Sequence, residues 1–97
     1  MSELWELSKP AELERVRVLE VAARAVADGA LTEPVRRGAQ DEAHRMAGAL
    51  AALGVDDGSK SARELERRFR SGPSIEQADE LAALVAALRT AVEQYRR

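Results

Sequence analysis

Few side chains in this sequence could carry out covalent chemistry, and His44 is the most informative of them. It is the single histidine among 97 residues, and the sequence contains no cysteine. One histidine cannot build a multi-histidine metal site within one chain, and without cysteine neither thiolate chemistry nor a disulfide is available. A neutral imidazole is a good nucleophile near neutral pH, because its reference pKa is about 6.5. Nucleophilic attack by one ring nitrogen is therefore the chemistry to consider.

Other kinds of reactive site are not indicated. The sequence has no phosphate-binding loop of the G-x-x-x-x-G-K-[ST] type and no G-x-G-x-x-G after a strand. It has no serine-centred nucleophile elbow, and a di-iron bundle would need two Glu-x-x-His helices. We therefore expect neither a nucleotide site nor independent catalytic machinery, and whether the protein is an enzyme in its own right stays open.

Small residues follow His44 along its predicted helix. Ala47, Gly48 and Ala51 leave one side of the imidazole uncrowded. A glycine in the middle of a helix costs about 1 kcal/mol relative to alanine, and its presence suggests close approach by another surface. Two plainer interpretations are a solvated histidine without a role and a glycine at a close crossing of two helices. The combination of His44 with Gly48 favours a functional site.

The elements that position His44 are predicted to be helices. Alanine, leucine, glutamate and arginine dominate the composition, and aromatic residues are only 3%. Apolar residues recur at spacings of three and four. The predicted helices cover about residues 11–28, 33–53, 59–71 and 75–96. Their expected inward residues are Leu13, Val16, Leu19, Ala23 and Val26, widened by Val18 and Val21; Val35, Ala39, Ala43, Met46, Leu50 and Leu53; Ala62, Leu65 and Phe69; and Ile75, Ala78, Leu81, Val85, Leu88, Val92 and Tyr95.

Helix-terminal residues separate the four segments. Gly29 fits a left-handed helix end, Gly54 ends the second helix, and Thr32 is a plausible N-cap. Before the first helix, Pro10 either starts it or kinks a longer one, and residues 4–7 could form a lead-in turn.

Two further signals mark the second half of the chain. Asp56, Asp57 and Gly58 predict a turn before the third helix, and Ser74 with Gln77 predicts a capping box before the fourth. On the third helix, Glu64 with Arg68 and Glu66 with Arg70 are expected to pair at a spacing of four residues.

Short connections make consecutive helices antiparallel neighbours, so we predict one all-α domain over residues 1–97, an up-down-up-down four-helix bundle. The formal charge of −2 argues against nucleic-acid binding. No apolar stretch is long enough to span a membrane and no export leader is evident, so we expect a cytoplasmic protein.

Residues 43–54, Ala-His-Arg-Met-Ala-Gly-Ala-Leu-Ala-Ala-Leu-Gly, resemble the phospho-acceptor segment of histidine phosphotransfer (HPt) domains. Residues 61–66 resemble the next helix of that family, with its alanine and its Leu-Glu pair. Many HPt domains carry lysine three positions after the histidine, where this sequence has Ala47. Its basic residue, Arg45, directly follows the histidine, as in the type found at the N-terminus of multidomain response regulators.

The resemblance implies a phosphoryl carrier with a phosphohistidine intermediate. His44 would accept a phosphoryl group from a receiver-domain aspartate, through Nε2, and pass it on. Gln40 and Asp41, one turn back, are candidates to orient the ring, and Arg45 and Arg37 could counter phosphoryl charge. Arg36, which lies further round the helix, is expected to serve solubility.

The implied partners are response-regulator receiver domains, with a hybrid histidine kinase as a further candidate. The chain would need no cofactor of its own, since Mg²⁺ is expected on the partner receiver. Ala47, Gly48 and Ala51 would form a flat apolar docking patch for a modest, transient encounter.

Three alternatives remain. A histidine-kinase dimerisation domain usually has a proline soon after the histidine and pairs two chains, whereas no proline follows His44 before Pro73, so we expect a monomer. The main alternative is a helical scaffold or protein-interaction bundle without phosphoryl chemistry. A nucleic-acid-binding helical domain is disfavoured by the acidic balance.

Overall fold

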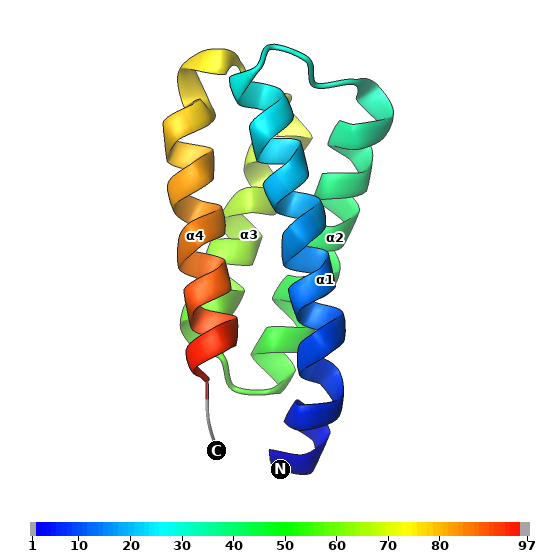
Figure 1. Cartoon of the computed structure of the whole chain (residues 1–97), viewed down its shortest axis with the longest axis vertical. Coiled ribbons are helices and arrows are strands. Elements are labelled where there is room, and N and C mark those ends of the chain that lie inside the picture. Colours follow the sequence, from blue (N-terminus) through cyan, green and yellow to red (C-terminus); the bar gives the residue numbers. More distant parts are fainter. Residues whose placement is uncertain (1, 96–97) are drawn as a thin grey trace.

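Four α-helices account for most of the chain. The structure is a computed structural model that describes the backbone of residues 2–95 and the side chains of residues 6–95. Within this range the order is α1 (Ser2–Ala27), α2 (Glu33–Ala52), α3 (Asp56–Ser71), the short 3₁₀ helix η1 (Ile75–Gln77) and α4 (Ala78–Gln94). Figure 1 shows α1 beside α4 in front of α2 and α3, with consecutive helices running in opposite directions. The predicted all-α, up-down-up-down bundle is confirmed.

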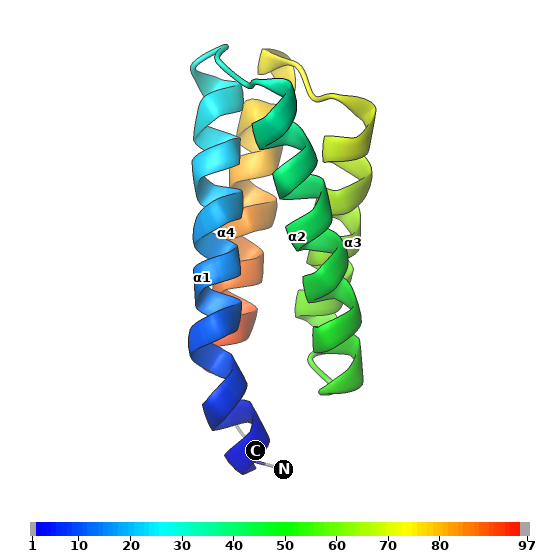
Figure 2. The same cartoon turned by 90° about the vertical axis from the view of Figure 1, so that its right-hand side faces the viewer.

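The bundle is elongated, and α2 and α3 form its most closely packed helix pair. It measures 40 × 21 × 18 Å, and the most extensive helix contact is that of α2 with α3, followed by those of α4 with α1 and with α3. Figure 2 shows the α2–α3 pair side by side over most of the length of the bundle. This pairing positions the candidate site, because His44 lies on α2 at the side of the helix that is next to α3.

One apolar stripe from each helix forms the core. Phe69, Met46 and the buried leucines of all four helices are fully enclosed. Each stripe follows the predicted spacing of three and four, because this spacing keeps side chains on one side of a helix. The fully buried large side chains are Val16, Leu19, Met46, Leu50, Leu65, Phe69, Leu81, Leu88 and Val92.

Four of the predicted inward residues lie outside the core. Val18 and Val21 of α1 are 43% and 59% exposed, because α2 and α4 cover only one side of that helix. Val35 and Ile75, at the starts of α2 and η1, are 38% and 55% exposed. The widened stripe predicted for the first helix is therefore wrong.

Pro10 lies inside a continuous α1 rather than at its start. The helix begins at Ser2, so the backbone of the predicted lead-in turn belongs to the same helix. Leu7, on this first part of α1, is 79% exposed. The structure thus decides between the two roles left open for Pro10 in favour of the longer helix.

Glycines end α1 and α2 as predicted. Gly29 and Gly54 have φ of 66° and 80°, a left-handed conformation that a Cβ would disfavour. In each case the glycine N–H and the next N–H bond back to the preceding helical turn: the amide of Ala30 reaches Ala25 O at 2.8 Å, and the amide of Val55 reaches Leu50 O at 2.8 Å. These paired bonds satisfy carbonyls that would otherwise lack partners.

The start of α3 differs from the prediction. The helix begins at Asp56, so Gly58 lies within its first turn rather than in a preceding loop. A Cβ on Gly58 would stand 3.0 Å from Leu50 Cδ1 and 3.2 Å from Val55 Cγ1. The residue is therefore a glycine because α3 packs closely against the end of α2, which local sequence rules do not reveal.

The two predicted N-caps have different outcomes. The Thr32 hydroxyl accepts a hydrogen bond from the Val35 amide at 3.4 Å, as expected. The capping box of Ser74 and Gln77 does not form, because residues 75–77 are a 3₁₀ turn without a side-chain cap. The Ser74 hydroxyl instead bonds the Glu76 side chain and lowers the pKa of that carboxyl. The fourth α-helix starts at Ala78 and ends at Gln94, and residue 96 of the predicted helix lies outside the described residues.

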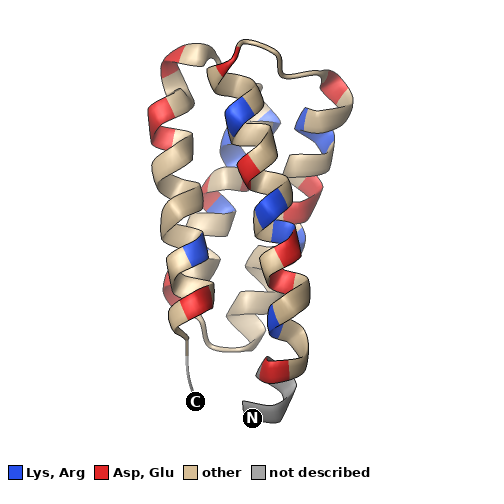
Figure 3. Ribbon diagram, in the orientation of Figure 1, with Lys and Arg blue, Asp and Glu red and all other residues tan. Residues whose placement is uncertain are grey.

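Polar contacts join helices that are distant in sequence. Arg89 of α4 donates to both carboxylate oxygens of Glu20 on α1, at 2.7 and 3.0 Å. The Tyr95 hydroxyl donates to Leu53 O at 2.9 Å. Figure 3 shows acidic and basic residues interspersed along the outer helix surfaces. Within the described part of the chain, no helix is both long enough and apolar enough to cross a membrane.

Candidate functional site

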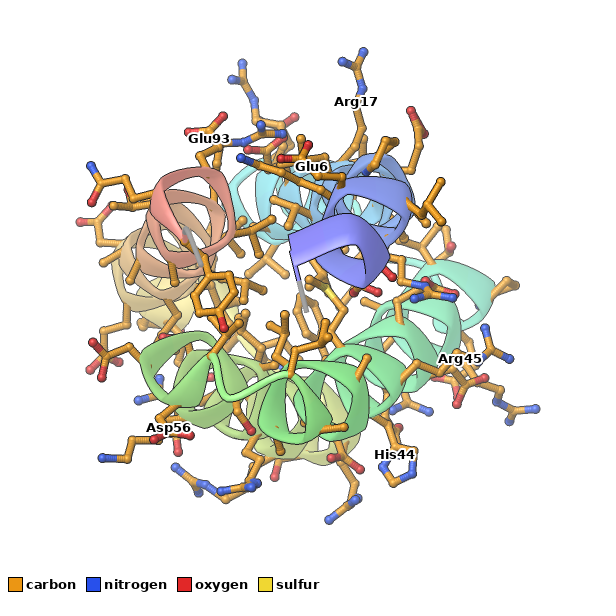
Figure 4. The ribbon with its side chains drawn as sticks, turned by 90° about the horizontal axis from the view of Figure 1, so that it is seen from below. Glu6, Arg17, His44, Arg45, Asp56 and Glu93 are labelled. Atoms are coloured by element: carbon orange, nitrogen blue, oxygen red, sulfur yellow. The ribbon has the colours of Figure 1, made fainter. Side chains whose placement is uncertain are left out.

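His44 projects from the outer side of α2, near the middle of the helix. Its side chain is 74% exposed, whereas Ala43 and Met46 on either side of it are fully buried. Figure 4 shows the imidazole directed away from the bundle. The buried stripe fixes the rotation of α2, and His44, about 100° round the helix from Ala43, lies on the flank of that stripe at the surface of the bundle, as the helical spacing predicts.

A carboxylate from the neighbouring helix holds the ring. Nδ1 of His44 lies 3.0 Å from Oε2 of Glu66 on α3, and the Glu66 side chain is only 16% exposed. A carboxylate only accepts hydrogen bonds, so this contact favours the tautomer with its hydrogen on Nδ1. Nε2 is then left as the nitrogen with an available lone pair.

The same carboxylate also binds a cation. Nη2 of Arg70 donates to Oε2 of Glu66 at 2.7 Å, within the predicted pair at a spacing of four residues. The imidazole and the guanidinium thus share one oxygen atom of Glu66. Ala62, Leu65 and Phe69 of α3 are fully buried. Their packing fixes the rotation of α3, and this holds Glu66 and Arg70 beside α2.

The small residues after His44 do not all lie on the surface. Ala47 is only 6% exposed, because three positions along a helix turn it back toward the buried stripe. Its carbonyl accepts a hydrogen bond from the buried Ser59 hydroxyl at 2.9 Å, which fixes α3 against α2 beside the site. The predicted patch of three small residues is therefore corrected to Gly48 and Ala51, which are both exposed.

Gly48 faces open space. Among the described residues outside its own stretch of helix, no atom lies within 4 Å of where a Cβ on Gly48 would stand. The glycine is thus not explained by a close helix crossing within the bundle. The functional interpretation of Gly48 is still that it leaves room for the surface of another molecule.

The two residues predicted to orient the ring are placed elsewhere. Gln40 accepts a hydrogen bond from Arg36 at 3.0 Å, and Arg36 also donates to Phe69 O at 2.9 Å. Asp41 is exposed beside a shallow pocket that Arg37 also lines. The contact to Nδ1 is made across the helix pair by Glu66 instead.

The two basic residues predicted to steady a phosphoryl group are paired with acids of their own helix. Arg45 donates to Glu42 at 2.7 Å, and Arg37 lies 3.6 Å from the Glu33 carboxylate. Figure 4 shows Arg45 directed outward on a different side of α2 from His44. Arg36, expected to serve solubility, instead joins the start of α2 to the end of α3; its bond to Glu33 lowers the pKa of that carboxyl.

Glu66, Arg70 and Ser59 are the site residues that sequence reasoning missed. Glu66 stood within the quoted Leu-Glu pair, and its pairing with Arg70 was predicted, but neither was linked to His44. The link depends on the register of α3 against α2. No cluster of three or more potential metal ligands occurs among residues 6–95.

Comparison with known protein families matches residues 10–97 to the Hpt domain, which is nearly the whole chain. The chain belongs to the Hpt domain family. No curated protein and no solved structure matches the chain. Family membership gives this Hpt domain a phosphotransfer role in two-component signalling, with response-regulator receivers and kinases as its kinds of partner.

Proposed function

We propose that this Hpt domain carries a phosphoryl group on Nε2 of His44, accepting it from a receiver-domain aspartate and passing it to another. The observation that carries the proposal is the exposed imidazole with Nδ1 held by Glu66. The other features of the site are consistent with it, because the space beside Gly48 admits a partner surface.

The chemistry follows from the tautomer. The Nε2 lone pair forms a bond to phosphorus, the bond from phosphorus to the aspartyl oxygen breaks, and the carboxylate leaves with the electron pair. The Nδ1 hydrogen stays in place, so the ring becomes cationic while the carboxylate of Glu66 stabilises it. Charge in such a transfer spreads over the equatorial phosphoryl oxygens. Mg²⁺ would belong to the receiver, and the part of this chain is to position the nucleophile.

The docking surface is proposed to lie around Gly48 and Ala51, on the α2 side of the helix pair. A flat surface of small residues lets a receiver bring its aspartyl phosphate close to Nε2. Charged residues around it would set orientation and association rate more than affinity. The encounter would be transient and modest in area.

Transfer from a panel of phosphorylated receiver domains tests the proposal. We expect a label on the chain that is acid-labile and alkali-stable, and its loss in His44→Gln. Because His44 is the single histidine, any phosphohistidine is assigned without mapping. A label that persists in His44→Gln would contradict the role of His44, and no label from any receiver would support the scaffold alternative instead.

A further inference from the structure

The basic residue that shares a hydrogen-bond partner with the His44 ring is Arg70 of α3. It does not lie on α2, the helix that carries His44. Arg70 and His44 bind the same oxygen of Glu66, at 2.7 and 3.0 Å. Two donors on one acceptor atom must lie close together, so the guanidinium is within a few ångströms of the imidazole. The Arg70 side chain is 59% exposed and therefore has room to change direction.

The basic residues of α2 are drawn away from the ring. The Arg45 guanidinium binds Glu42, which also lies 3.4 Å from Arg15 of α1. Arg37 lies seven residues before His44, so it is two helical turns away, beside Glu33. Neither of them shares a partner with the imidazole.

Charge balance gives Arg70 two effects. A phosphoryl group brings nearly two negative charges beside the Glu66 carboxylate, and like charges at this separation repel. The ion pair with Arg70 offsets the charge of that carboxylate. A guanidinium also has five N–H donors, so a bond to Glu66 leaves others that can reach phosphoryl oxygens.

We propose that Arg70 binds the phosphoryl group carried by His44, so that the phosphoryl site is shared between α2 and α3. This inference rests on the proposed function of His44. The N–P bond forms on Nε2, the hydrogen on Nδ1 stays there and remains bonded to the Glu66 carboxylate, and Arg70 turns part of its donor set from that carboxylate to the phosphoryl oxygens. No proton is transferred to or from Arg70.

Potassium phosphoramidate is a suitable probe, because it donates its phosphoryl group to an imidazole and releases ammonia without any partner protein. Phosphorus NMR would follow the growth and the hydrolysis of phosphohistidine. In Arg70→Gln we expect labelling about fivefold slower and hydrolysis correspondingly faster, since one charge-assisted contact is lost. Arg70→Lys should retain part of the effect, and high salt should reduce the difference between variants.

Arg67→Gln is the matched control. Arg67 is on the same helix and 64% exposed, but its guanidinium pairs with Glu64 and shares no partner with His44. It should behave as the unaltered protein. Equal rates in Arg70→Gln, Arg67→Gln and the unaltered protein would overturn this inference alone. No label on the unaltered protein, or a label that persists in His44→Gln, would overturn the proposed function as well.

Discussion

The contact between His44 and Glu66 determines which ring nitrogen reacts. With Nδ1 bound to the carboxylate at 3.0 Å, phosphorylation should occur at Nε2. We expect Glu66→Ala to slow transfer from a receiver by about tenfold or more, as loss of an orienting partner of histidine does elsewhere. Phosphoramidate should then label both nitrogens, because neither is held. The two phosphohistidine isomers are distinguished by phosphorus NMR.

Glu66→Gln provides the control for this prediction. The amide oxygen still accepts a hydrogen bond from Nδ1, so the Nε2 isomer should remain dominant. A purely structural role of Glu66 would change stability without changing the ratio of isomers. An unchanged ratio in a folded Glu66→Ala protein would therefore contradict the orienting role.

Glu12 of α1 is a buried carboxyl with incomplete hydrogen bonding. It is 3% exposed, and Oε2 accepts a bond from Arg15 at 2.8 Å, whereas Oε1 has no partner among the described residues. Burial raises the pKa of this carboxyl above its ordinary value, although Arg15 opposes the shift. The ionised form therefore costs stability at neutral pH.

We expect Glu12→Leu to stabilise the protein by about 1 kcal/mol at pH 7, since an unsatisfied buried acceptor is removed. Arg15 retains Glu42 as a partner at 3.4 Å. A raised pKa means that protonation favours the folded state, so the gain should shrink as the pH falls through the raised pKa toward 4.5. Thermal unfolding at several pH values measures this. The exposed Glu14→Leu is the control, and an equal gain there would contradict the explanation.

At the scale of the helices, Gly48 lowers the intrinsic stability of α2, because glycine has a low helix propensity. No neighbouring atom would meet a Cβ there, nor at Gly38 on the same helix. Alanine at either position should therefore stabilise the protein by about 1 kcal/mol through helix propensity. Thermal unfolding should show similar gains for Gly48→Ala and Gly38→Ala.

Larger side chains should separate the roles of the two glycines. Gly48→Leu is expected to fold and to react with phosphoramidate, but to lose transfer from a receiver, because the leucine fills the docking surface. Gly38→Leu should keep both reactions. If Gly48→Leu accepted the phosphoryl group from a receiver at the normal rate, the docking surface would lie elsewhere.

Helical periodicity predicted the four elements and the outward position of His44, because both depend on residues within one helix. It could not predict which side of α1 is covered, and so Val18 and Val21 were misplaced. It also placed Gly58 in a turn, because the close contact with Leu50 that favours glycine there comes from another helix. The partnership of Glu66 with His44 depends on interhelical register in the same way.

At the scale of the whole molecule, acidic pH should remove stabilising ion pairs. The carboxyl of Glu64 has its pKa lowered to about 2 by bonds from Arg67 and Arg68, and that of Glu20 is lowered by Arg89. A lowered pKa gives stability that is present above the ordinary value of 4.5 and is lost as the pH falls toward about 2. The melting temperature should therefore fall between these values.

Glu64→Gln serves as the check on this pH dependence. The variant should be less stable than the unaltered protein at pH 7, and the difference should disappear near pH 2. A constant difference across this range would mean that the ion pairs contribute nothing to the acid response.

The core is completed by four helices of one chain, so we expect a monomer of 10.6 kDa in solution. Light scattering coupled to size exclusion measures this mass directly. A dimer would contradict this expectation and would mean that two complete bundles associate through their surfaces. The exposed Val18 and Val21 would then be the first residues to examine at the contact.

Because the imidazole stands on one helix and its carboxylate on the next, reactivity depends on side-chain docking rather than on helix content. A loosened state could retain the circular dichroism of the native bundle while α2 and α3 no longer keep their register. In such a state the choice between the two ring nitrogens would disappear before the helical signal fell. The isomer ratio of phosphohistidine would thus report whether α2 and α3 are still packed in their native register.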